Sequence, residues 1–168
     1  MSKMSIDQLV VADRDLSFDL TDSYLISYPE FVRFFESLEV IDRHYLIIGA
    51  NLVYGWMPTI LHFKSDDLEG VARLVNEVKR GHKLSLGELT TVKQLVNNSV
   101  VGTSKLLHFA NPSLYPIWDS KICAFLTGKK HTVNHVESYL EYVQYCDELV
   151  RDARFGDVHR SVERKLTY

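Results

Sequence analysis

Apolar residues recur at every third or fourth position along most of the chain, which is the spacing of one face of an α-helix. Residues 68–78 and 133–150 carry the clearest stripes. The first consists of Leu68, Val71, Ala72, Val75 and Val78, and the second of Val133, Val136, Tyr139, Leu140, Val143, Cys146 and Val150. No internal repeat or convincing domain linker interrupts the pattern. We therefore predict an all-α fold of about seven to eight helices in one compact domain, residues 1–168.

Capping residues and helix breakers indicate where individual helices begin and end. Asp66-x-x-Glu69 and Ser85-x-x-Glu88 are capping boxes, which open helices, and Gly81 closes the first of these two helices. The second helix is broken by the residues 97–99, and a short helix resumes over residues 105–109.

Other boundaries rest on single residues. Pro29 is expected in the first turn of a helix that ends near Leu38. A long helix is predicted from Thr132 to about Arg154, and Gly156 is expected to separate it from a last short helix. Residues 1–22 receive no clear assignment and could form a loosely ordered N-terminal segment.

The stretch from Tyr45 to Phe63 contains no charged side chain and approaches the length of a membrane span. However, it includes Asn51, His62 and Pro58, and charged residues crowd both of its ends. A buried helix of roughly residues 41–55, broken before Pro58, is the better interpretation. Since the N-terminus also lacks a secretory pattern, we expect a cytoplasmic protein that does not bind membranes.

Composition excludes several other classes. An apolar fraction of 46% and a charged fraction of 24% are typical of a globular protein and exclude a disordered chain. Two cysteines, Cys123 and Cys146, cannot form a disulfide framework or a four-thiolate zinc site. His131 and His135 lie four residues apart, as paired zinc ligands do, but a full ligand set is missing. We therefore expect no metal and no other cofactor.

The net charge of −3 conceals a gradient along the chain. Residues 1–42 hold nine acidic and three basic residues. Residues 93–135 hold five lysines, three histidines and a single acidic residue, Asp119. The acidic average therefore does not exclude an anionic ligand such as DNA.

Residues 91–126 carry the most informative pattern. They predict a helix, a tight hairpin, a second helix, a proline-bounded loop and an aspartate that opens another helix. The backbone N–H groups at the start of the second helix suit a phosphate group. Asn97 and Asn98 can supply the positive φ angles that such a turn needs.

This order of elements resembles the helix-hairpin-helix DNA glycosylase superfamily. Leu95-Val96 stands at the hydrophobic pair before the hairpin, Gly102-Thr103 at the small residues of the second helix, and Pro116-Ile-Trp-Asp119 at the Pro-hydrophobic-Asp segment. The residues 104–120 look most like those of short glycosylase-like proteins from bacteria and their phages. The resemblance covers residues 91–126.

The resemblance implies a protein that acts on the N-glycosidic bond of a base, either ordinary or modified, that is flipped out of double-stranded DNA. Val101 occupies the position of the Schiff-base lysine, which implies a monofunctional glycosylase. The family's iron–sulfur cluster is excluded, since the four cysteines are missing. Asp119 would be the catalytic carboxylate, with Lys105 beside it as a second catalytic candidate.

Each candidate residue also has a structural interpretation. Asp119 is a good helix N-cap, and Lys105 could be a solvated helix lysine. The candidates for contact with the substrate base, Trp118, Tyr115, His108, Trp56 and Tyr54, could equally belong to the core. The candidates for contact with DNA are Asn97, Asn98, Ser99, Gly102, Thr103, Lys121, Lys129 and Lys130.

Three other functions remain open at this point. The same scaffold could carry a base-modification enzyme. A helix-hairpin-helix module without chemistry could bind DNA or a nucleotide. Finally, a protein-interaction factor of phage or mobile-element origin could use the acidic N-terminal segment. The pattern favours no particular oligomeric state.

Overall fold

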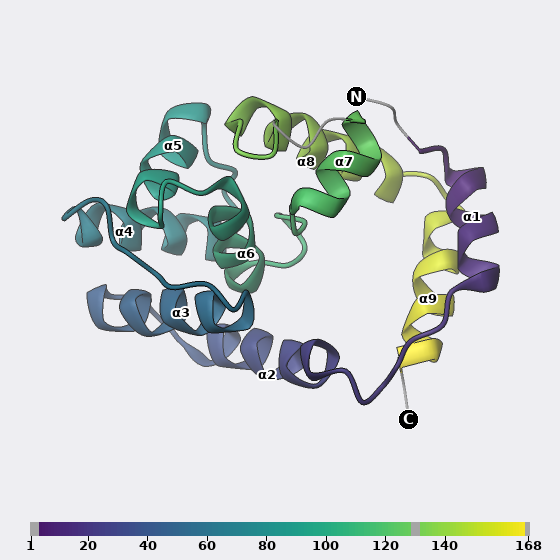
Figure 1. Cartoon of the computed structure of the whole chain (residues 1–168), viewed down its shortest axis with the longest axis horizontal. Helices are drawn as coiled ribbons and strands as arrows, with labels where there is room; N and C mark the ends of the chain where they lie inside the picture. Colours follow the sequence, from purple (N-terminus) through teal and green to yellow (C-terminus); the bar gives the residue numbers. More distant parts are fainter. Residues whose placement is uncertain (1–3, 129–131, 167–168) are drawn as a thin grey trace.

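The computed structural model describes residues 4–128 and 132–166. Within these ranges the chain forms nine α-helices and no strand, which confirms the all-α prediction (Figure 1). One isolated bridge pairs Phe63 with Val96. The helices are α1 (Ile6–Asp15), α2 (Ser23–Ser37), α3 (Arg43–Trp56), α4 (Leu68–Lys79), α5 (Leu86–Leu95), α6 (Val100–Ala110), α7 (Ser120–Thr127), α8 (Val136–Val150) and α9 (Phe155–Leu166).

Helix α6 lies at the centre of the packing, in contact with α2, α3, α4 and α5. Eight of its eleven residues are buried. The other three, Val101, Lys105 and His108, are only partly exposed and follow the spacing of one helical stripe. Lys105 and His108 therefore share the one face of this helix that its neighbours leave partly open.

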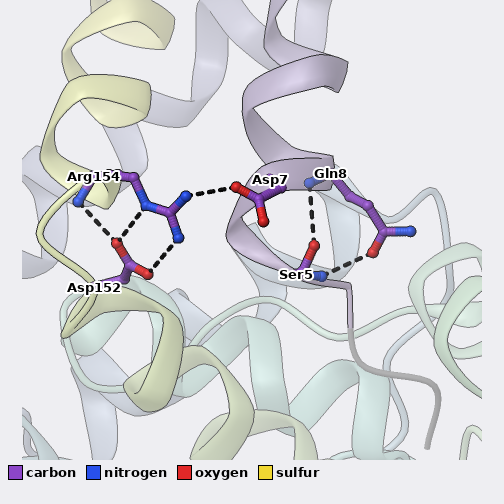
Figure 2. A network of polar contacts seen from close by, with 5 residues as sticks. All are labelled: Ser5, Asp7, Gln8, Asp152 and Arg154. Atoms are coloured by element: carbon purple, nitrogen blue, oxygen red, sulfur yellow. Dashed lines mark hydrogen bonds and ion pairs between the residues drawn. The ribbon is translucent and has the colours of Figure 1, made fainter.

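The ends of the described chain lie together. Helices α1 and α9 are side by side, away from α3 to α5 (Figure 1). Asp7 pairs with Arg154 at 2.5 Å and Asp13 pairs with Lys165 at 3.0 Å, so the two helices run in the same direction. Arg154 also binds Asp152, and both carboxylates raise the pKa of its guanidinium (Figure 2).

Several helix boundaries match the sequence. The Ser85–Glu88 capping box opens α5. Gly81, with φ of 95°, follows α4, and the hydrogen bonds of the Gly81 and His82 amides form a Schellman motif. Helix α3 confirms the buried helix predicted near residues 41–55. No helix in the described ranges is long and apolar enough to span a membrane.

Other boundaries differ from the prediction because a different residue supplies the cap. Asp67 rather than Asp66 caps α4, since its carboxylate accepts from the Gly70 amide. Asp22 caps α2, which begins at Ser23, so Pro29 lies inside the helix and not in its first turn. Ser99 caps α6, so this helix is longer than the predicted residues 105–109.

Differences also occur near both ends of the chain. The sequence pattern assigns no element to residues 1–22, yet Ser5 and Gln8 form a capping box that opens α1 (Figure 2). Helix α8 begins at Val136 instead of Thr132. The break before α9 lies at residues 151–154, where Asp152 accepts from the Arg154 amide, and Gly156 is helical.

The contact between α3 and α6 depends on a glycine. The Tyr54 hydroxyl donates to the Val96 carbonyl at 2.9 Å, at the end of α5. The ring passes so close to Gly102 that a Cβ atom there would collide with the hydroxyl oxygen. Tyr54, a candidate for binding the substrate base, is thus 2% exposed and holds α3 against the turn between α5 and α6.

We predict that Gly102→Ala lowers the free energy of unfolding by about 1–3 kcal/mol, because the new methyl group overpacks this contact. In a Tyr54→Phe background the same change should cost at least about 0.5 kcal/mol less, since the nearest atom is gone. Urea denaturation of the four proteins measures this coupling. Gly87→Ala is the matched control, because a Cβ there has no neighbour within 4 Å. Additive costs would contradict the proposed contact.

Candidate functional site

Asp119 both caps α7 and offers a carboxylate oxygen for chemistry. Its backbone is extended, and its Oδ1 accepts from the amides of Lys121 and Ile122, each at 2.8 Å. Oδ2 makes no hydrogen bond with any residue that the structure describes. The capping interpretation is therefore correct, and it is compatible with the catalytic one, because only one oxygen serves the cap.

The residue before Asp119 is held by a buried hydroxyl. Ser104 Oγ on α6 accepts from the Trp118 amide at 3.0 Å, and its one proton lies within reach of two carbonyls, that of Val101 at 2.9 Å and that of Trp118 at 3.1 Å. The Trp118 indole donates to the Val133 carbonyl at 2.8 Å. The backbone that leads into Asp119 is therefore fixed from two sides.

The rest of this loop is also anchored by tyrosines. The Leu84 amide donates to the Tyr115 hydroxyl at 2.7 Å, and the Tyr139 hydroxyl donates to the Pro116 carbonyl at 3.2 Å. Both rings are buried. A loop with these buried polar contacts holds its last residue in a defined position, which is the arrangement that a preorganised site needs.

Lys105 lies near Asp119 on the partly open stripe of α6. Its Nζ is 4.9 Å from the centroid of the Trp56 ring, a cation–π contact. Burial lowers the pKa of this ammonium group, and the nearby negative charge of Asp119 partly offsets the effect. Among the described residues Lys105 forms no ion pair within 4 Å, so its charge is available to an anionic ligand.

His108 is a neutral, fully hydrogen-bonded histidine. The Tyr115 carbonyl lies 2.7 Å from Nδ1 and can only accept, so Nδ1 carries the proton. The Tyr28 hydroxyl then donates to Nε2 at 2.8 Å. Burial lowers the pKa of His108. Both ring nitrogens of His108 therefore bond within the fold, as in the interpretation that places this residue in the core.

The aromatic candidates divide into two groups. Trp118, Tyr115 and Tyr54 are at most 2% exposed, and their rings pack in the core. Trp56 is only partly buried, and it lies among the rings of Tyr24, Phe31 and Phe109. Of the tryptophan and tyrosine candidates, Trp56 is therefore the one that is not fully buried, and it lies directly beside Lys105.

The turn between α5 and α6 has the predicted backbone. Asn97 and Asn98 have φ angles of 55° and 50°, so asparagine does supply the left-handed conformation. However, Asn97 is used within the fold: its side chain accepts from the His62 amide and donates to the Ile60 carbonyl.

The expectation that this turn exposes amides for a phosphate is wrong for three of them. The Val100 amide donates to Asn134 Oδ1 at 2.8 Å, and the amides of Gly102 and Thr103 donate to the side chain and carbonyl of Ser99. Gly102 and Thr103 are buried, so neither residue offers a DNA-binding surface. The acceptors come from a residue 34 positions away and from the cap, which local spacing does not reveal.

The basic candidates lie outside the turn between α5 and α6. Lys121 is exposed in the first turn of α7. Lys129, Lys130 and His131 lie outside the described residues. His135 is exposed at the start of α8, and no group of three or more possible metal ligands occurs in the described part of the chain.

Three residues that contact the candidate residues are not predicted from the sequence. Ser104 is a polar residue on the buried face of α6, a signal that could have been noticed. Tyr28 comes from α2, and Tyr142 comes from α8, where its ring centroid lies 5.1 Å from that of Trp118. Burial raises the pKa of Tyr142. Neither tyrosine could be placed here without the tertiary packing.

We found no matching family model, curated protein or solved structure for this chain.

We predict that His108 makes the fold less stable in mild acid. Its pKa is lowered in the folded state, so the unfolded chain binds a proton first as the pH falls through about 6.5. The stabilising contribution of neutral His108 is thus present above that pH and lost below it. Urea denaturation between pH 7.5 and 5 should show a smaller loss of stability in His108→Gln than in the wild type. Equal pH dependence would contradict the neutral assignment.

Proposed function

We propose that this chain is a monofunctional DNA N-glycosylase in which Asp119 is the catalytic carboxylate. The observation that supports this most directly is the geometry of Asp119: one oxygen is fixed by two helix amides, and the other makes no hydrogen bond within the described residues. The ammonium of Lys105 lies near enough for Asp119 to affect its pKa. The resemblance of residues 91–126 to helix-hairpin-helix glycosylases supports the same reaction.

The proposed chemistry begins as the bond between C1′ and the base breaks and the base leaves with the electron pair. The sugar then develops oxocarbenium character, which a nearby carboxylate stabilises electrostatically. Asp119 Oδ2 accepts a proton from a water molecule, whose oxygen forms the new bond to C1′. The departing base takes up a proton from solvent. Neither step needs an amine nucleophile, in keeping with Val101 at the Schiff-base position.

The surroundings of Asp119 suit an anionic, aromatic substrate. Lys105 would bind a DNA phosphate, because a partly buried ammonium has lost part of its hydration. Trp56 would stack on the flipped base, since base–aromatic stacking contributes about 1–3 kcal/mol per base. This assignment replaces the broader aromatic set expected from the sequence, most of which is buried.

We predict that Asp119→Asn lowers the single-turnover rate of base release at least about 100-fold, because the amide cannot supply the negative charge. Asparagine is an equally good cap, so the free energy of unfolding should change by no more than about 1 kcal/mol. The assay is a base-release screen on DNA with modified bases. Asp67→Asn removes a carboxylate from another helix N-cap and serves as the matched control.

The same screen separates the alternative functions. Exchange or alteration of a base without its net release would indicate a base-modification enzyme. DNA binding with steep salt dependence but no release from any duplex would indicate a binding module. Binding to neither duplex nor single-stranded DNA would favour a protein-interaction factor. Each of these three outcomes contradicts the glycosylase proposal.

We predict that Lys121→Ala weakens duplex binding uniformly across sequences and reduces the salt slope by about one. The physical reason is the loss of one phosphate contact next to Asp119. Fluorescence anisotropy at several salt concentrations measures both effects. Arg80→Ala removes another exposed charge, at the end of α4, where it pairs with Glu77, and should leave the slope unchanged. Equal salt slopes for all three proteins would show that Lys121 does not contact a DNA phosphate.

A further inference from the structure

Ser104 joins the two segments that carry the candidate catalytic residues. Ser104 immediately precedes Lys105 on α6, and Trp118 immediately precedes Asp119. One hydroxyl lies within hydrogen-bond distance of both backbone groups of Trp118, at 3.0 Å from the amide and 3.1 Å from the carbonyl. This contact therefore lies one residue away from both members of the Lys105–Asp119 pair.

The chemistry of this contact requires a hydroxyl group. The Ser104 oxygen accepts from the Trp118 N–H, and its proton can go to the carbonyl of Val101 at 2.9 Å or that of Trp118 at 3.1 Å. A hydroxyl can accept and donate in this way, and a methyl group cannot. Ser104 is 0% exposed, so water cannot take over either bond without a rearrangement. Without the hydroxyl the Trp118 amide would lose the acceptor that it has in this structure.

We propose that Ser104 is a positioning residue that holds the Asp119 carboxylate in register with Lys105. Its catalytic meaning rests on the proposed glycosylase function, whereas its effect on the geometry does not. Ser104 itself touches neither substrate nor the reacting atoms. It acts through the extended backbone at residues 118 and 119, which directs Asp119 Oδ1 to the amides of Lys121 and Ile122.

The test compares Ser104→Ala with Ser104→Thr, which restores a hydroxyl. In Ser104→Ala we expect the single-turnover rate of base release to fall about 10- to 100-fold, the loss that small misplacement of a catalytic group produces. Affinity for duplex DNA should change less than about twofold, since binding groups are retained. The Lys121 and Ile122 amides should exchange with solvent faster, because their acceptor is less well held. Ser104→Thr should recover a large part of each loss.

Two further measurements distinguish positioning from a general loss of stability. The pKa of Lys105, followed by NMR, should fall further in Ser104→Ala, because the stabilising charge of Asp119 is no longer held nearby. Thr91→Val also removes a hydroxyl bonded to a backbone carbonyl, but on α5, and should change neither this pKa nor the Lys121 and Ile122 exchange. If Ser104→Ala does not fold, Ser104→Cys, which bonds only weakly, provides the same comparison.

The outcomes for the two proposals are separable. If the wild type releases no base from any substrate, the glycosylase proposal fails, while amide exchange and the Lys105 pKa still decide the role of Ser104. If the Lys121 and Ile122 amides of Ser104→Ala exchange at the wild-type rate and its Lys105 pKa is unchanged, the positioning role is wrong. Base release that falls equally in Ser104→Ala and Ser104→Thr, with unchanged exchange, would also overturn it.

Discussion

The burial of α6 is the constraint on which the rest of the structure depends. Four helices pack around it, and eight of its eleven residues are removed from solvent. Such a helix leaves little room for polar groups, so each one that it carries has a specific partner or lies on the open stripe. Ser104 points to the backbone of Trp118, whereas Lys105 and His108 occupy the stripe. The candidate site exists where this buried helix meets the start of α7, and its rigidity comes from the core itself.

Local chemistry explains why the sequence predicts much of the fold. A capping box such as Ser85–Glu88 and a left-handed turn such as Asn97–Asn98 involve neighbours in the chain, and both occur in the structure as predicted. Where two local options compete, neighbouring residues do not decide between them. Asp66 and Asp67 are both suitable caps, and only the structure shows that Asp67 accepts the hydrogen bond from the Gly70 amide.

The candidate site could be predicted only in part, because its details depend on distant residues. The role of Asp119 as a cap follows from its neighbours, and the structure adds that Oδ2 makes no bond within the described ranges. The prediction that the hairpin amides are free for a phosphate is wrong because Asn134, which accepts from the Val100 amide, belongs to another part of the chain. Likewise, no periodicity shows that Trp118 lies in the core while Trp56 remains partly exposed. Spacing identifies the chemistry that a residue can perform, but packing decides whether a ligand can reach it.

The pairing of α1 with α9 has a consequence for the order in which the chain can fold. Asp7 meets Arg154 and Asp13 meets Lys165, so these contacts close loops that contain most of the protein. Among the nine described helices α1 is synthesised first, but its main helical partner, α9, is synthesised last. The helices around α6 can pack before that partner exists, because they are contiguous in sequence. In a nascent chain the core around α6 would therefore be assembled before α1 can pack against α9.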